Sequence, residues 1–314
     1  MYKVLILGLD DYTTDERGDV GSRVRIASIQ GLTSVSLTLL TLVKSDPAYS
    51  EYLPADLYQE AISGILKQGV ERLDNVRQHA GESVIRLLRC PPPSVDGSNP
   101  WKFRGEHLFE ELLLRYDSYP ALFLPFSNVS KRDNPDDDPA GSHGWQDGTW
   151  IFPRAMKFLE IPEYRHSVLA GLLVSVGSKT DSTVNGFYIR RRRGAESIPI
   201  DDVAFLGQLR HVRSSIVKYT KRLPAEANNG GGNYSLHAFA TDLIGEAKSN
   251  LNKNSKVIPV LQVFNLLLET DALERLFETK GGINRCEAMH LSCISELEPR
   301  TVYRSYSRLR QRGS

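Results

Sequence analysis

Few residues of this 314-residue chain stand at spacings that would support catalysis or metal binding. Cys286, His290 and Cys293 are zinc-binding residue types, but they supply only three ligands, at a spacing unlike that of structural zinc sites. The glycine run 230–232 lacks the Lys-Ser/Thr ending of a phosphate-binding loop, so a linker is the better interpretation. The seven histidines are scattered, and no Ser–His–Asp, Cys–His or paired-carboxylate set can be assembled. We therefore expect no enzyme active site, no metal and no other cofactor.

Two segments are strongly basic. Arg190–Arg193 could contact an acidic protein surface, nucleic acid or an import receptor, although a solvated loop or helix end is commoner. The segment 300–312 is also basic, and we expect an exposed tail because no nucleic-acid-binding module surrounds it. Lys and Arg number 39 against 38 Asp and Glu, so the net charge predicts neither nucleic acid nor an anionic membrane as a partner.

One spaced set of residues is typical of helical repeats. In HEAT repeats the second helix often carries Asp, then Val-Arg five and six residues later, then a small residue. This chain has Asp19, Val24, Arg25 and Ala27 at those positions. Asp and Arg on stacked helices can join neighbouring repeats by charge-assisted hydrogen bonds, while Val and Ala pack in the seam.

The elements that would position these residues are helices. Apolar residues recur at helical spacing, and no segment alternates cleanly enough to require a strand. The helices are expected near residues 17–43, 57–70, 76–88, 150–159, 164–176, 203–223, 236–251 and 257–268. Their irregular period suits HEAT-type repeats of roughly 40–47 residues. The sequence therefore predicts an all-α fold, a HEAT/armadillo-like α-solenoid of stacked antiparallel helix pairs that grips another protein.

The expected domain organisation is simple. Residues 1–277 form one HEAT-like helical domain, with polar loops near 91–101 and 127–148 and a flexible linker near 225–233. Residues 278–314 form a divergent basic tail. The chain begins as though inside an element, which favours a fragment of a longer protein. Three sparse cysteines and the absence of a secretory signal favour a soluble cytosolic protein.

The acidic segment Asp10–Asp15 has two interpretations that the residues alone leave open. It could be purely structural, with Thr14 or Asp15 capping the following helix. Alternatively, its acidic and aromatic side chains could touch a protein partner.

Two long stretches resemble the tubulin-folding cofactor D family, specifically its C-terminal region. The first stretch, Leu9–Arg25, follows the family's Asp-Tyr-Thr-Thr-Asp-x-Arg-Gly-Asp-Val-Gly run. Its matching residues include Asp11, Tyr12, Thr13, Thr14, Arg17, Gly18, Asp19, Val20, Gly21 and Arg25. The second stretch spans residues 152–182 and includes Pro153, Arg154, Tyr164, Arg165, Gly171, Ser175 and Gly177. The sequence departs from the family at the basic run 190–193 and again beyond about residue 278.

The resemblance implies a chaperone that binds β-tubulin after the chaperonin and helps to assemble the αβ-tubulin heterodimer. It also implies tubulin-folding cofactors C and E and an Arf-like small GTPase as partners, and a role in stimulating the GTPase of tubulin. It implies a cytoplasmic, cytoskeleton-associated protein. The matched residues are then candidate protein-binding or structural positions, and none is catalytic. A generic HEAT-repeat adaptor without tubulin specificity, or a fragment with no activity of its own, are the alternatives.

Overall fold

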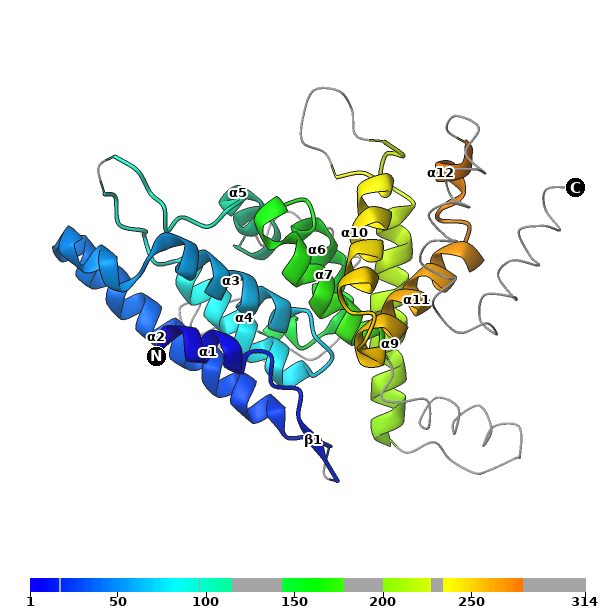
Figure 1. Ribbon diagram of the computed structural model, residues 1–314, viewed down its shortest axis with the longest axis horizontal. Helices are drawn as coiled ribbons and strands as arrows, with labels where there is room; N and C mark the ends of the chain where they lie inside the picture. The colour runs from blue at the N-terminus through cyan, green and yellow to red at the C-terminus, as the bar shows by residue number, and fades with distance from the viewer. Residues whose placement is uncertain (17, 96, 115–142, 178–199, 227–233, 279–314) are drawn as a thin grey trace, which may run out of the picture. The chain divides into compact units, whose positions relative to one another are not determined.

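The computed structural model describes residues 1–314 except 17, 96, 115–142, 178–199, 227–233 and 279–314 (Figure 1). The described chain is built almost wholly from helices, so the predicted all-α class is confirmed. It forms two compact units, Met1–Gly171 and Leu172–Ser314. The basic run 190–193, the Cys286–Cys293 set and the tail beyond 278 lie outside the described residues. The expected single domain over residues 1–277 stays a prediction.

The first unit is built from helices joined by several short turns. Its elements are α1 (Tyr2–Gly8), β1 (Thr14–Asp15), β2 (Gly18–Asp19), α2 (Gly21–Ser45), η1 (Pro47–Tyr52), α3 (Ala55–Gly69), α4 (Asp74–Leu88), α5 (Glu106–Phe109), η2 (Glu110–Leu114), η5 (His143–Trp145), α6 (Gly148–Phe158) and the start of α7 (Pro162–Val176). No strand was expected, but a two-residue antiparallel pair closes the α1–α2 connection, with Thr14 opposite Asp19.

Helix α2 is the central helix of the first unit. Its buried positions follow the helical period, and Ile29, Leu32 and Val43 have almost no exposed surface. The helix contacts α1, α3, α4 and η1. Among the described helices it is the one long and apolar enough to cross a membrane, but the core helix of a soluble protein passes the same test. Its fully buried Arg25 fits a protein interior with polar partners.

Helices α3 and α4 form an antiparallel pair beside α2, joined by a short turn (Figure 1). Tyr58, Ile62 and Ile65 of α3 and Val76 and Val84 of α4 are essentially unexposed. Tyr58, Ile62 and Ile65 lie at i, i+4 and i+7, and Val76 and Val84 at i and i+8, so each set lies on one face of its helix. The chain leaves α4 shortly before the prolines 91–93, which cannot continue a helix. The expected loop over 91–101 is free of helix wherever it is described.

An aromatic cluster fills the space between α5, α6 and α7. The rings of Phe109 and Phe158 stack with centroids 4.5 Å apart, and Tyr164 meets Phe109 edge-on at 6.0 Å. Such offset and edge-to-face arrangements suit the quadrupoles of aromatic rings. The cluster fixes the start of α7 within the first unit.

The second unit contains the end of α7, α9 (Ile200–Thr220), α10 (Leu236–Ser249), α11 (Asn254–Glu269) and α12 (Glu274–Glu278). Ser235 caps α10, because its Oγ accepts the Ala238 N–H at 3.1 Å. The core of this unit comes from one face of each longer helix, with Val212, Leu243 and Val260 fully buried. The helices expected near 203–223, 236–251 and 257–268 are confirmed.

The segment expected as a loop over 127–148 is described only at its end. Residues 127–142 lie outside the described residues, but His143–Trp145 form a 3₁₀ turn and α6 begins at Gly148. Trp145 is fully buried rather than part of a solvated loop. The polar composition of the segment did not indicate a buried residue, because a single tryptophan carries most of its apolar area.

Candidate protein-interaction site

The segment between α1 and α2 is a tight hairpin that presents polar side chains to solvent. Asp11 Oδ1 accepts the Thr13 N–H at 2.9 Å, and the Thr13 carbonyl accepts the Gly21 N–H at 2.9 Å. Gly18 has φ +115°, a left-handed conformation that glycine adopts without strain. Thr13, Thr14, Asp15 and Glu16 are exposed, so the tip of the hairpin is available to a partner.

Gly21 lets the hairpin lie against the helix. It is the first residue of α2. A Cβ there would lie 2.4 Å from the Asp11 carbonyl oxygen, so only glycine lets the hairpin close against the helix. The hairpin could not fold back with any larger residue at this position.

The predicted cap of α2 is wrong, because neither Thr14 nor Asp15 caps the helix. Instead, Asp19 Oδ1 accepts the Ser22 N–H at 3.1 Å, and the Asp19 carbonyl accepts the Ser22 hydroxyl at 2.6 Å. Both expected residues are in β1, one strand earlier than the helix start. Asp19 therefore caps the start of α2 and also binds Arg25.

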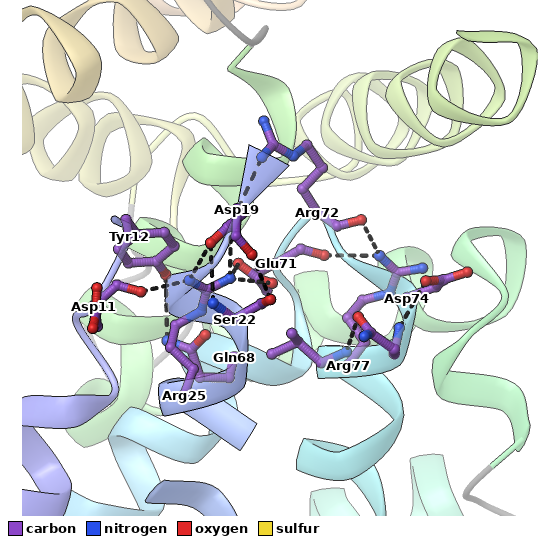
Figure 2. Close-up of polar contacts among 12 residues, drawn as sticks. Asp11, Tyr12, Asp19, Ser22, Arg25, Gln68, Glu71, Arg72, Asp74 and Arg77 are labelled. Carbon is purple, nitrogen blue, oxygen red and sulfur yellow. Dashed lines mark hydrogen bonds and ion pairs between the residues drawn. The ribbon is translucent and has the colours of Figure 1, made fainter. Parts of the chain in front are cut away.

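Arg25 holds the hairpin from within the protein (Figure 2). Its Nη1 donates to the Asp11 carbonyl at 2.6 Å and to Asp19 Oδ1 at 3.1 Å, and its Nη2 donates to Asp19 Oδ2 at 3.0 Å. Nη2 also donates to Glu71 Oε1 at 3.2 Å. The Tyr12 ring lies 4.3 Å from the guanidinium carbon. The planar fork of arginine suits several acceptors at once.

Glu71 is the acidic partner that the sequence reasoning missed. It follows α3 and joins the α3–α4 pair to α2 through Arg25. The predicted ladder between neighbouring helix pairs therefore exists, but its second carboxylate belongs to Glu71, 46 residues after Arg25. That separation is about one HEAT period, so a search for an acid one repeat downstream could have found it.

Polar side chains of α3 complete the site. Gln68 Nε2 donates to the Leu9 carbonyl at 2.8 Å and to the Tyr12 hydroxyl at 3.3 Å. Lys67 forms an ion pair with Asp10. Arg72 lies 3.9 Å from Asp19, on the solvent side of the cluster. The hairpin is thus attached to α3 as well as to α2.

Burial shapes the electrostatics of the cluster. Burial raises the pKa of Glu71, and the Arg25 charge only partly offsets it. Burial alone would lower the pKa of Arg25, but the hydrogen bond to Asp19 and the charges of Glu71 and Asp19 raise it instead. Burial and the nearby Glu71 also raise the pKa of the Tyr12 hydroxyl. Arg25 therefore stays charged, and the cluster is a structural clamp rather than a proton-transfer site.

A second clamp lies on the other side of Glu71. Arg77 is fully buried and donates to four backbone carbonyls: Glu71 at 2.8 Å, Arg72 at 2.7 Å, Trp145 at 2.9 Å and Gln146 at 2.6 Å. Burial lowers the pKa of Arg77 to about 10. Arg77 thereby ties the segment before α6 to the turn that carries Glu71. Figure 2 shows its bonds to the carbonyls of Glu71 and Arg72.

The second matched stretch is mainly structural. Pro153 lies on the exposed face of α6, and Arg154 Nη1 donates to the Trp150 carbonyl at 2.8 Å. The Tyr164 hydroxyl donates to Gln59 Oε1 at 2.5 Å, and Arg165 Nε donates to the Leu159 carbonyl at 2.7 Å. These three hydrogen bonds lie within α6, at its C-terminal end and between α7 and α3.

Three small residues of this stretch serve close packing. A Cβ on Gly171 would lie 2.3 Å from the Lys67 carbonyl, so this glycine lets α7 approach α3 beside the site. In the second unit, Ser175 is buried, and a Cβ on Gly177 would lie 2.8 Å from Pro259 Cγ. Val20 is the residue before α2, and Arg17 lies outside the described residues.

The hairpin tip is the part of the site that is open to a partner. Within the described ranges, no group of three or more His, Cys, Asp or Glu side chains is placed to hold a metal ion. The carboxylates of Asp19 and Glu71 are occupied by Arg25. What the site presents outward is the rigid, polar hairpin tip.

Comparison with known proteins gives one finding about the family. The family model described as "Tubulin folding cofactor D C terminal" matches residues 59–187 and 208–299. The match leaves out 188–207, where the basic run interrupts the resemblance, but it continues past residue 278, where the resemblance was expected to end. The hairpin precedes the matched residues. No solved structure matches the chain.

Proposed function

Because the chain belongs to the tubulin folding cofactor D family through its C-terminal domain, we propose that it binds β-tubulin during assembly of the αβ-tubulin heterodimer. The hairpin of residues 10–21 is the contact surface in this proposal. The chain performs no covalent chemistry. It contributes to the stimulated GTPase of tubulin by holding tubulin in a favourable arrangement.

The hairpin is proposed as the contact surface because its tip is exposed while its base is buried. The tip side chains from Thr13 to Glu16 are exposed, whereas Arg25 at the base has no exposed surface. Such a clamp orders the loop before any partner arrives, so binding loses less conformational entropy. Exposed polar side chains on a rigid support are suited to recognising a protein.

The partners follow from the family. We propose that the chain acts together with tubulin-folding cofactors C and E and with an Arf-like small GTPase. The proposed location is the cytoplasm, in association with the tubulin cytoskeleton. A generic helical-repeat adaptor, without preference for tubulin, is the competing function that the experiment must separate.

A pull-down with purified tubulin tests the proposal. The Asp15→Lys/Glu16→Lys variant reverses two exposed charges at the hairpin tip. It is expected to weaken capture of β-tubulin by about tenfold, since misplaced charges at an interface repel the partner. The matched control, Glu51→Lys/Glu60→Lys, reverses two exposed charges on η1 and α3, away from the hairpin. The control should capture β-tubulin as well as the parent chain does.

The outcomes separate the two parts of the proposal. Failure of the parent chain to retain β-tubulin, alone or with cofactors C and E, contradicts tubulin binding. Equal capture by the parent chain and the hairpin variant leaves tubulin binding in place but rejects the hairpin as its surface. A GTP-hydrolysis assay with tubulin and cofactors C and E extends the test. There, the hairpin variant should stimulate less than its control.

A further inference from the structure

The solvent face of α9 carries charges of one sign over the part whose side chains the structure describes, from Gly207 onward. From Gly207 onward, four exposed side chains bear charge: Arg210, Lys218, Lys221 and Arg222. Lys221 continues the last turn of the helix, because its N–H donates to the Val217 carbonyl at 3.0 Å. At 100° per residue, Arg210, Lys218 and Lys221 fall within about a quarter of the helix circumference. We call these four residues the basic face.

The basic face is not used by the fold. The opposite face of α9 is buried through Leu209, Val212 and Ile216. Among the described residues, none of the four cations forms an ion pair. A cation in the last turn, such as Lys218, complements the helix dipole, but Arg210 lies about two turns earlier, where that effect has faded. The length of the stripe therefore has no structural explanation.

The charge asymmetry also holds from α9 to the start of α11, although Glu269, Asp271 and Glu274 are exposed acids further along the second unit. Between Gly207 and Lys256, the described exposed acids amount to Glu226 alone. The exposed bases of the same region include, besides the basic face, Lys248, Lys253 and Lys256 of the α10–α11 region. Helix α11 contacts α9, so both belong to the same packed unit. Positive potential of this kind attracts a polyanion.

We propose that the basic face of α9 binds an acidic, extended polypeptide segment of a partner protein. The four cations span about 18 Å along the helix at 1.5 Å per residue. An extended chain covers that length with about five or six residues at 3.3 Å each. A run of glutamate or aspartate residues of that length could place a carboxylate near each cation.

Two other polyanions fit the surface less well. A membrane-binding helix must insert its apolar face among the lipids, but the apolar face of α9 is buried in the second unit. A surface for single-stranded nucleic acid combines cations with aromatic side chains that stack on bases. The exposed face of α9 between Gly207 and Arg222 has no exposed aromatic residue, since Tyr219 is buried. An acidic polypeptide needs only the cations.

Fluorescence anisotropy with the full chain tests the proposal. The probe is a labelled oligoglutamate of about eight residues, long enough to cover the face. The Arg210→Gln/Lys218→Gln/Lys221→Gln/Arg222→Gln variant should bind the probe at least about tenfold more weakly, and 0.3 M salt should weaken binding by the parent chain. The matched control is Lys3→Gln/Lys44→Gln/Arg86→Gln/Arg89→Gln, which removes the same charge from exposed positions of the first unit.

Each result supports or overturns the proposal. Unchanged binding by the control, with loss in the α9 variant and equal helicity of both, supports it. Equal loss in both variants shows a diffuse charge effect and overturns it, as does absence of probe binding to the parent chain at low salt. Tighter binding of oligouridylate or of phosphatidylserine vesicles overturns it in favour of nucleic acid or membrane. Because no tubulin is present, this result is independent of the hairpin experiment.

Discussion

Arg25 is the residue on which the hairpin depends. One guanidinium satisfies the Asp11 carbonyl and the carboxylates of Asp19 and Glu71, and it lies against the Tyr12 ring. The ammonium group of a lysine has three donors on one atom and could not reach these acceptors from a single position. The two carboxylates are almost unexposed, at 7% and 1% of their side-chain surface. Removing Arg25 would therefore leave buried charge without compensation.

We expect Arg25→Met to destabilise the first unit by about 3–5 kcal/mol, because two buried carboxylates lose their cation. Urea unfolding followed by circular dichroism measures this change. Glu71→Gln added to Arg25→Met should recover part of the loss, since it removes one of the stranded charges. Arg23→Met is the control in the same helix. Its side chain is exposed, and its effect should stay within about 0.5 kcal/mol.

A loss for Arg25→Met no larger than that for Arg23→Met would mean that the cluster does not hold the hairpin. A double variant less stable than Arg25→Met alone would show that Glu71 contributes independently of Arg25. Increased proteolysis within residues 10–21 in Arg25→Met, but not in Arg23→Met, is the expected local signature.

At the scale of elements, Trp145 joins the segment before α6 to the α3–α4 pair. Its ring lies where Gly69 and Gly81 leave space, since a Cβ on either glycine would fall within 2.4 Å of the ring. Its carbonyl accepts the Arg77 Nε–H at 2.9 Å. Glycine costs helix stability relative to alanine. The space needed by the Trp145 ring therefore explains why Gly69 and Gly81 are glycines.

This packing predicts opposite effects for two chemically identical substitutions. Gly81→Ala should destabilise the protein by about 1–3 kcal/mol through overpacking against Trp145, despite the better helix propensity of alanine. Gly245→Ala in α10 should stabilise it by about 0.5–1 kcal/mol, because a Cβ there meets nothing within 4 Å. Thermal unfolding of both variants measures the contrast.

A double variant isolates the part of the Gly81→Ala destabilisation that is due to Trp145. In a Trp145→Ala background, which is itself expected to cost about 3–5 kcal/mol, Gly81→Ala should lose most of its penalty. Stabilisation by Gly81→Ala in the parent chain would contradict the proposed packing of Trp145.

The elements were more predictable from the sequence than their connections. The helical period gives α2, α3, α4, α10 and α11 because each buries one continuous apolar stripe. The Asp19–Arg25 pair was also predictable, since both residues are close in the sequence and typical of HEAT repeats. Glu71 and Trp145 were not. Each makes its contact with residues 46 or more positions away, and neither interrupts a local pattern.

At the scale of the whole first unit, ionisable tyrosines are buried throughout the packed layers. Tyr2, Tyr58 and Tyr164 have 8% or less of their surface exposed. The Tyr2 hydroxyl forms a 2.7 Å hydrogen bond with the Ser36 hydroxyl. Burial raises the pKa of Tyr2 to about 12 and raises the pKa values of Tyr12, Tyr58 and Tyr164 as well. The stability of this unit is therefore coupled to alkaline pH.

The direction of this pH dependence follows from the difference between the tyrosine pKa in the unfolded chain and in the folded chain. An unfolded tyrosine loses its proton near pH 10, whereas folded Tyr2 keeps it to about pH 12. The stabilisation from Tyr2 is therefore full below pH 10 and is lost between about pH 10 and 12, by about 2–3 kcal/mol.

Urea unfolding at pH 8 and pH 11 should show a clear fall in the free energy of unfolding of the parent chain. Tyr2→Phe should reduce that fall, although it costs about 1 kcal/mol at pH 8 through the lost hydrogen bond. Tyr52→Phe, at a position with 63% of its surface exposed, should leave the fall unchanged. An identical pH dependence in Tyr2→Phe and Tyr52→Phe would show that the buried hydroxyl of Tyr2 does not couple folding to pH.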